Sequence, residues 1–231
     1  MPEIDGPQPR EKMMPHAYQR RQLLSAAIGL TAASMALPAM AQQPRLKLPE
    51  VTEGPFYPPK RWRAQLSDWD ADLTRVSNGG QTLTAQGEHL GLELRVLDTA
   101  GKAVDRVELE IWQCDAHLVY RHPSEVDEAR MDKGFQGFGS AITSAQGAAA
   151  FRTIKPVAYP GRTPHIHIKL RHASFGELTS QLFVAGDPGN ARDGIWRRLG
   201  AQRQSALDMV LQPAQEDGLR WRVQHLLVVG A

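Results

Sequence analysis

The stretch Tyr159-Pro160-Gly161-Arg162-Thr163-Pro164-His165-Ile166-His167-Ile168-Lys169-Leu170 sets the fold class and the candidate site of this chain. Polar and apolar residues alternate from Pro164 to Leu170, which is the period of a β-strand, so His165 and His167 are expected on one face. At about 3.3 Å per residue the two imidazoles lie about 7 Å apart along the backbone, and their ring nitrogens can converge on one ion. Imidazole suits iron, zinc, copper and nickel.

A His-x-His pair alone also fits the solvated face of an edge strand. The residues just upstream favour a metal site instead. Three turn-forming residues, Pro160, Gly161 and Pro164, bring the Tyr159 phenol and the Arg162 guanidinium beside the two histidines.

Further short segments with β character flank this strand. Those with clear alternation or β-branched and aromatic residues are 90–97, 107–112, 179–184 and 221–229, and those with weaker signals are 118–121, 138–143 and 148–154. One helix is expected near residues 193–200. Because many short strands alternate with frequent turns, the sequence predicts an all-β fold, an antiparallel β-sandwich with long loops and little helix.

Residues 1–41 resemble an export signal, which leaves residues 42–231 as one domain. Arg20 and Arg21 precede an uncharged stretch from Ser25 to Leu37, and Ala39-Met40-Ala41 has the form of a cleavage site. The apolar run is shorter than the roughly 20 residues of a membrane-spanning helix, so we expect no stable membrane anchor. The paired arginines resemble a twin-arginine signal, with an ordinary secretory signal as the alternative. The expected location is periplasmic or extracellular.

The charge of the chain excludes an electrostatic argument for nucleic acid as a partner. The 27 basic and 25 acidic side chains give a formal net charge of +2, and removing four basic and three acidic residues with the signal leaves +1. The single cysteine, Cys114, forms no intrachain disulfide and is expected to be a small buried residue.

An ordered loop is expected at residues 52–59, which contain Gly54, Pro55, Pro58 and Pro59 and are therefore unsuited to a helix or a central strand. The aromatic residues Phe56 and Tyr57 are costly to leave in water. They either seal one end of the core or line the mouth of a pocket.

Several motifs, in order along residues 52–185, resemble those of the intradiol ring-cleavage dioxygenases, the family of the protocatechuate and catechol dioxygenases. The matching pieces are Gly54–Tyr57, Glu110–Gln113, Tyr120–His122, Phe151–Pro156, Tyr159-Pro160 and Arg162–His167.

The resemblance implies a non-haem ferric iron, Fe(III), held by two tyrosines and two histidines. By position, Tyr120 matches the tyrosinate that stays bound, Tyr159 the one that catechol displaces, and His165 and His167 the imidazole pair. Anionic phenolates stabilise the ferric state, and neutral imidazoles leave the ion acidic enough to bind a catecholate.

The resemblance also implies the roles of residues around the metal. Arg162 matches the arginine that stabilises negative charge on the bound aromatic ring, and Gln181 matches a pocket glutamine with a one-residue shift in spacing. Pro55, Phe56 and Tyr57 are expected to contact the substrate. The implied reaction is cleavage of a catechol-type diol by dioxygen, between the two hydroxyl-bearing carbons, to a muconate-type product. A homo-oligomer is compatible with this.

Two departures from the family pattern leave the choice of catechol open. Tyr159 lies only six residues before His165, where better-known members have a longer insert, and the long helical N-terminal region of the catechol 1,2-dioxygenases is missing. The other histidines of residues 42–231 are expected on the surface or in the core, with His122 as the one closest to the metal; they are His89, His117, His122, His172 and His225.

Two alternative functions remain at this point. One is a secreted, non-catalytic β-sandwich binding module whose tyrosines and histidines serve packing and surface recognition. The other is a zinc or copper site built from His165, His167 and a carboxylate such as Asp115 or Asp187.

Overall fold

The computed structural model describes residues 45–66, 68–124 and 127–230. The predicted export signal, residues 1–41, lies outside these residues. The elements in chain order are α1 (Lys60–Arg63), β1 (Arg75–Asn78), β2 (Gln81–Thr84), β3 (His89–Asp98), β4 (Glu108–Trp112), η1 (Glu128–Arg130), β5 (Phe138–Ile142), β6 (Ala148–Ile154), β7 (His165–His172), β8 (Gly176–Val184), η2 (Asn190–Arg192), α2 (Gly194–Leu199), α3 (Ala201–Ser205), β9 (Asp208–Met209), β10 (Gln212–Pro213) and β11 (Trp221–Val229).

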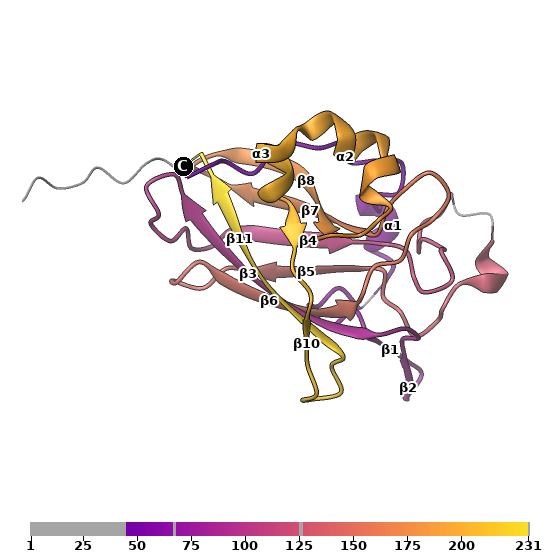
Figure 1. Cartoon of the computed structure of the whole chain (residues 1–231). Coiled ribbons are helices and arrows are strands. Elements are labelled where there is room, and N and C mark those ends of the chain that lie inside the picture. The colour runs from indigo at the N-terminus through magenta and orange to yellow at the C-terminus, as the bar shows by residue number, and fades with distance from the viewer. Residues whose placement is uncertain (1–44, 67, 125–126, 231) are drawn as a thin grey trace, which may run out of the picture. The chain divides into compact units, whose positions relative to one another are not determined.

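Two sheets and a small hairpin make up the described domain (Figure 1). One sheet has the strand order β10-β11-β3-β6 and the other β5-β4-β7-β8-β9, while β1 and β2 pair only with each other. Neighbouring strands are antiparallel except for β11 beside β3 and β8 beside β9. The predicted all-β sandwich with little helix is confirmed, with these two parallel pairs added.

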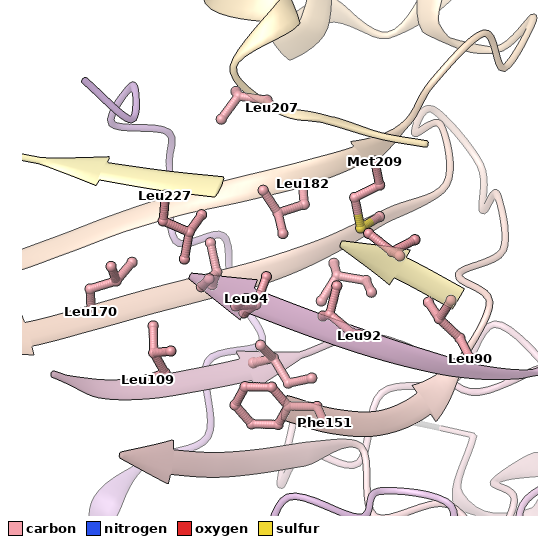
Figure 2. Close-up of a cluster of buried hydrophobic side chains, with 14 of the residues drawn as sticks. Leu90, Leu92, Leu94, Leu109, Phe151, Leu170, Leu182, Leu207, Met209 and Leu227 are labelled. Carbon is pink, nitrogen blue, oxygen red and sulfur yellow. The ribbon is translucent and has the colours of Figure 1, made fainter. Parts of the chain in front are cut away.

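Apolar side chains from both sheets fill the space between them (Figure 2). Leu90, Leu92 and Leu94 alternate along β3 and are at most 2% exposed, and Ile166, Ile168 and Leu170 do the same along β7 with 0% exposed. Burying one such side chain contributes about 1.5–3 kcal/mol. The period-2 pattern therefore fixes which face of each strand meets the core.

Strand β7 lies in the middle of its sheet, paired with β4 on one side and β8 on the other. His165 and His167 point away from the core but are each only 3% exposed, because other parts of the chain cover this outer face. The alternative of a polar pair on a solvated edge strand is therefore wrong.

The expected strand at residues 118–121 is wrong. The Asp115 carboxylate accepts hydrogen bonds from the backbone N–H groups of His117 and Val119, at 2.8 and 2.9 Å, and Leu118 has φ +71°. These contacts fold the chain into a turn because a short polar side chain competes with ladder pairing for the backbone. Tyr120 consequently follows a turn.

The segment 60–80, which reads as irregular in sequence, contains α1 and β1. Both elements have only four residues, too few for a periodic signal. The expected helix near 193–200 is α2. Within the described residues, no helix is long and apolar enough to cross a membrane.

Candidate metal centre

The two histidines of β7 bring their outer ring nitrogens together. His165 Nε2 lies 3.2 Å from His167 Nε2, and His165 Nδ1 is 2.7 Å from the carbonyl oxygen of Thr163. Since a carbonyl only accepts, His165 Nδ1 carries the proton and donates it, which leaves Nε2 as the free lone pair. The strand thus presents two imidazole nitrogens to one point.

Burial keeps both imidazoles neutral. Desolvation, and then the nearby Arg162 charge, lowers the pKa of His165 to about 4. Desolvation, and then the neighbouring His165 and Arg162, lowers the pKa of His167 well below its ordinary value. Neutral imidazole is the form that binds a metal.

The two predicted tyrosine ligands converge on the same place. The ring centroids of Tyr120 and Tyr159 are 5.9 Å apart, with the rings nearly perpendicular. Tyr120 lies 6.3 Å from the His167 ring, and Tyr159 lies 5.5 Å from the His165 ring. Each tyrosine therefore accompanies one histidine, and the four predicted ligands form one cluster.

The donor set fits a ferric ion. Desolvation raises the pKa of Tyr120 well above its ordinary value, and Tyr159 and Cys114 raise it further. A phenol this deeply buried ionises when a cation lies close enough to offset the cost of its negative charge. The two phenol oxygens are hard donors. The two neutral imidazole nitrogens, which lie 3.2 Å apart, are borderline donors, and the combination suits Fe(III).

His167 is held from two sides. The indole of Trp112 stacks on its ring at 4.8 Å and 11°. On another side, a Cβ placed at Gly54 would lie 3.4 Å from His167 Cε1, and Gly54 has φ +74°. The positive φ favours glycine at position 54, whereas the ring beside it would leave an added Cβ at ordinary contact distance.

Arg162 is fixed beside the tyrosine and histidine cluster by three side chains. Its Nε donates to Asp193 Oδ2 at 2.8 Å, and one of its terminal nitrogens donates to the Gln181 side-chain oxygen. The other terminal nitrogen lies 3.5 Å from the Tyr159 hydroxyl. The guanidinium charge thus faces the predicted displaceable ligand.

Asp193 is a functional residue that the sequence did not reveal. One carboxylate oxygen accepts from Arg162 and from the Thr163 N–H, and the other caps α2 by accepting from the Ile195 and Trp196 N–H groups. The side chain is 0% exposed. An aspartate before a helix predicts the cap, but nothing in the sequence indicates the second pair of contacts.

Gln181 is fully buried and lies opposite His167 in the register of β7 and β8. Its amide donates to the Thr52 carbonyl at 2.8 Å, while its oxygen accepts from Arg162. The structure thus places Gln181 between the arginine and the loop 52–59.

A cleft of about 380 Å³ opens beside the cluster, and Tyr159, Arg162, Thr163, Arg192 and Asp193 are among the residues that line it. Its guanidinium groups offer charge to an anionic ligand. The cleft meets the cluster at Tyr159 and Arg162, the two groups expected to act on the substrate.

The loop residues predicted to contact substrate lie in different surroundings. Phe56 stacks on Tyr120 with centroids 4.5 Å apart and an interplanar angle of 13°. The Tyr57 hydroxyl instead bonds to Glu110 at 2.6 Å, away from the histidines. Substrate contact by Pro55 and Phe56 stays a prediction, and Tyr57 is placed to hold the loop. His122, expected closest to the metal among the other histidines, packs edge-on against Phe56 at 5.7 Å.

The carboxylates proposed for a zinc or copper site are engaged elsewhere. Asp115 accepts from His117, Val119 and Asp132 N–H groups, and Asp187 accepts from Gly189 N–H and Thr163 Oγ1. Among the described residues, no group of three or more His, Cys, Asp or Glu could hold a metal. The predicted ligands whose rings lie beside His165 and His167 are Tyr159 and Tyr120.

Comparisons with known proteins show the family of the chain. A family model described as Dioxygenase (Dioxygenase_C) matches residues 52–222. The chain is 38% identical over 151 residues to the protocatechuate 3,4-dioxygenase beta chain of Burkholderia cepacia, covering 61% of this chain and 63% of that protein. It is 29% identical over 136 residues to hydroxyquinol 1,2-dioxygenase of Corynebacterium glutamicum, covering 51% and 43%. The chain thus spans less than two thirds of the length of these relatives.

Solved structures agree as well. The dioxygenase domain of a dioxygenase and carbohydrate-binding protein fusion from Streptomyces sp. SirexAA-E aligns with a TM-score of 0.60 and 28% identity, covering 80% of this chain and 99% of that one. An intradiol ring-cleavage dioxygenase from Tetranychus urticae has the same TM-score at 21% identity, covering 80% and 95%, and shows the shared fold. With the family model matched across most of the chain, this protein belongs to the intradiol ring-cleavage dioxygenase family.

Proposed function

We propose that this protein is a non-haem ferric iron dioxygenase that cleaves catechol-type aromatic diols between their two hydroxyl-bearing carbons, giving muconate-type products. The observation that supports this best is the convergence of His165 and His167, 3.2 Å apart at Nε2, with the rings of Tyr120 and Tyr159. Bound there, Fe(III) would supply a Lewis-acidic, redox-active centre at which a catecholate and dioxygen react.

The unequal burial of the tyrosines supports different roles for them. Tyr120 is 4% exposed and covered by Phe56, whereas Tyr159 is only half-buried and lies in a turn closed by the Arg162 N–H donating to its carbonyl at 2.9 Å. A buried, stacked ring cannot rotate away without disrupting its neighbours, but a half-buried ring can. Tyr120 is therefore the constant ligand, and Tyr159 is the one a catechol displaces.

Tyr159 is the group placed to take up a proton from the substrate. Its phenolate oxygen would accept the proton of a catechol hydroxyl, and Arg162, 3.5 Å away, would stabilise that phenolate before the transfer. The positively charged guanidinium of Arg162 can stabilise negative charge that builds on the substrate ring. Asp193 and Gln181 hold the guanidinium in place.

Iron analysis and product identification test the proposal. Purified protein should carry about one iron per chain and absorb visible light, since phenolate bound to ferric iron gives a charge-transfer band. His165→Ala should lose iron, whereas His172→Ala is the matched control at the far end of β7, because His172 bonds to Ser174 instead.

The product separates the reaction classes. Catechol should give cis,cis-muconate with both atoms of dioxygen incorporated. A yellow semialdehyde would show cleavage outside the diol and contradict the intradiol assignment. Colourless, iron-free protein with no oxygen uptake would favour the binding module, although the burial of Tyr120, His165 and His167 argues against surface recognition by these residues.

A further inference from the structure

The loop 52–58 covers the outer face of β7 and is held there mainly by side chains. Within the described part of the chain, no backbone hydrogen bond joins residues 53–58 to either sheet; the nearest runs from Val51 N–H to the Thr179 carbonyl. A loop without backbone pairing depends on its side-chain contacts for its position. The contacts that hold this loop therefore bear on the site beneath it.

The inner side of the loop touches two of the predicted metal ligands. Phe56 stacks on Tyr120, and Gly54 lies against the His167 ring. A shift of the loop would change the surroundings of one tyrosine and one histidine together.

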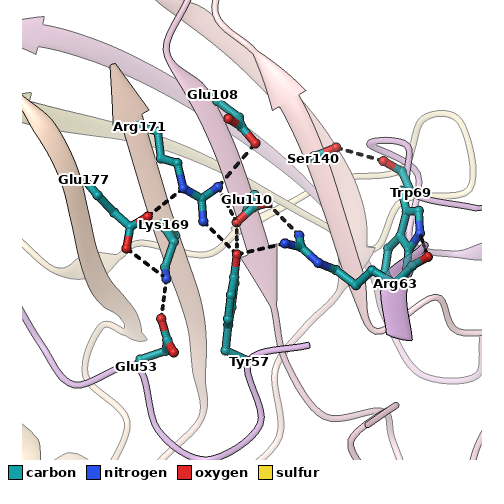
Figure 3. Close-up of polar contacts among 10 residues, drawn as sticks. All are labelled: Glu53, Tyr57, Arg63, Trp69, Glu108, Glu110, Ser140, Lys169, Arg171 and Glu177. Carbon is teal, nitrogen blue, oxygen red and sulfur yellow. Dashed lines mark hydrogen bonds and ion pairs between the residues drawn. The ribbon is translucent and has the colours of Figure 1, made fainter. Parts of the chain in front are cut away.

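The hydroxyl of Tyr57 fastens the loop to the sheet (Figure 3). It donates to Glu110 Oε2 at 2.6 Å and accepts from Arg171 at 2.8 Å and Arg63 at 3.2 Å. A hydroxyl has one donor and two lone pairs, so all of its hydrogen-bonding capacity is used. Burial, followed by the Glu110 hydrogen bond, raises the pKa of Tyr57 to about 12, and the group stays a phenol.

The partner of this hydroxyl is a buried carboxylate with its own support. Glu110 is 2% exposed, and its two oxygens also accept from Arg63 at 2.7 Å and from Arg171 at 3.0 Å. Bonds to charged partners are stronger than neutral ones. Because both guanidiniums still neutralise Glu110 when the hydroxyl is removed, Tyr57→Phe leaves no unpaired buried charge.

The aromatic ring of Tyr57 continues the contact toward the metal ligands. It meets the Trp112 indole edge-on at 4.9 Å, and Trp112 in turn stacks on His167 at 4.8 Å. On another side the Lys169 ammonium lies 3.9 Å from the Tyr57 ring centroid. Glu110 and Trp112 are both on β4, so the anchor and the histidine support share one strand.

We infer that Tyr57 is a positioning residue for the reaction proposed above, on which this inference rests. Its hydroxyl, bound by Glu110, Arg63 and Arg171, holds the loop 52–58 so that Phe56 stays on Tyr120 and Gly54 stays against His167. The same loop carries Pro55 and Phe56, which are predicted to contact the substrate. Tyr57 touches none of the predicted ligands itself.

The test compares Tyr57→Phe with Ser140→Ala. Ser140 lies on the same outer face, and its hydroxyl bonds to the Trp69 carbonyl, so its removal deletes a nearby hydroxyl without touching Tyr57. Tyr57→Phe should keep its iron and shift the visible band, because Phe56 no longer holds the Tyr120 ring in one place. KM for catechol should rise about tenfold with kcat changed less than about threefold, since only the fraction of molecules with a closed loop binds substrate. Ser140→Ala should leave the visible band and both kinetic constants unchanged.

Limited proteolysis gives a readout that does not need activity. A glutamate-specific protease should cleave after Glu53 at least about tenfold faster in Tyr57→Phe than in the wild type, with or without iron, because a loop that opens locally is more easily cleaved. An unchanged cleavage rate would refute the anchor. Faster cleavage with unchanged KM and an unchanged band would refute its role in the reaction. If the wild type proves inactive on every catechol, the proposed function fails together with the kinetic role, and the cleavage rate still decides the anchor.

Discussion

Replacing Asp193 by Asn removes one charge from a side chain that serves two structures at once. In the wild type, Oδ2 accepts from Arg162 and the Thr163 N–H at 2.8 and 3.0 Å, and Oδ1 accepts from the Ile195 and Trp196 N–H groups at 2.8 and 3.0 Å. Asn caps helices about as well as Asp, so its oxygen can keep the α2 cap. The other terminal group of Asn is NH₂, which donates and cannot accept. It would face Arg162 Nε and the Thr163 N–H, which both donate to the carboxylate oxygen in the wild type.

The cost follows from these contacts. A hydrogen bond to a charged group contributes about 1.5–3 kcal/mol, and a buried donor left without an acceptor adds about 1 kcal/mol or more. Because the Arg162 side chain is 16% exposed, water can hydrogen-bond to the released guanidinium and offset part of this cost. We expect a net loss of about 2–4 kcal/mol in the free energy of unfolding. At roughly 2–4 °C per kcal/mol for a domain of this size, Tm should fall by about 5–15 °C.

The loss depends on pH in a defined direction. Burial alone would raise the pKa of Asp193, but hydrogen bonds from the Thr163 and Trp196 amides and from Arg162 lower it below its ordinary value. Because the folded-state pKa is lowered, the stabilisation is fully present above the higher, unfolded-state pKa and is lost as pH falls through the folded-state pKa. The difference in Tm between wild type and Asp193→Asn should therefore be constant from pH 7 to about 5 and shrink below about pH 4.

Thermal unfolding followed by circular dichroism, with kcat measured alongside, checks both effects. The released Arg162 should lower kcat by about tenfold to a hundredfold, because a small displacement of a charge-stabilising group is costly in the transition state. Asp187→Asn is the control, since Asp187 belongs to the same loop and bonds to Thr163 but not to Arg162. A Tm within about 1 °C of wild type, or a loss equal to that of the control, would refute this reasoning.

Four further variants test the site and the export signal. Arg162→Ala should bind iron normally but consume oxygen at least about 10²-fold more slowly, because the charge of Arg162 matters most as negative charge builds on the substrate. If the variant loses iron in proportion to its activity, Arg162 has a structural role instead. Tyr159→Phe should retain iron through Tyr120, His165 and His167 but show slow substrate exchange in stopped-flow spectra, whereas an unchanged rate would remove Tyr159 from proton transfer. Tyr120→Phe should lose or strongly shift the visible band, and an unchanged spectrum would exclude it as a ligand. Replacing Arg20 and Arg21 with Lys should leave the precursor inside the cell on fractionation, and normal export would indicate the general secretory route.

The sequence predicted the strands whose pattern was long and regular. β3, β7 and β11 have eight or more residues, and β3 and β7 alternate cleanly, so a period of two stands out. The pattern also placed His165 and His167 on one face. It did not show that this face is covered, since the covering loop 52–58 is distant in sequence and held by side chains.

Short and tertiary features escaped prediction. The Asp115 turn overrode the β-like composition of residues 118–121, and the four-residue elements α1 and β1 were too short to detect. The second function of Asp193 and the support of His167 by Trp112 depend on neighbours that meet only in the folded chain. The alternation along residues 107–112 indicated a half-buried strand, but it did not reveal that Trp112 stacks on the His167 ring.

The four predicted ligands lie on parts of the chain that differ in rigidity. His165 and His167 lie on the central strand of a sheet whose opposite face inserts Ile166, Ile168 and Leu170 into the core with 0% exposed, so they move only if the core repacks. Tyr120 and Tyr159 follow turns, and their rings are placed by contacts with Phe56 and with Arg162. A site of this kind can exchange a tyrosine for substrate without disturbing the histidines, because the energy that fixes the imidazoles lies in the core on the other side of the sheet. Substrate preference should accordingly vary through the loops that carry Phe56 and Tyr159, while the His-x-His strand stays constant.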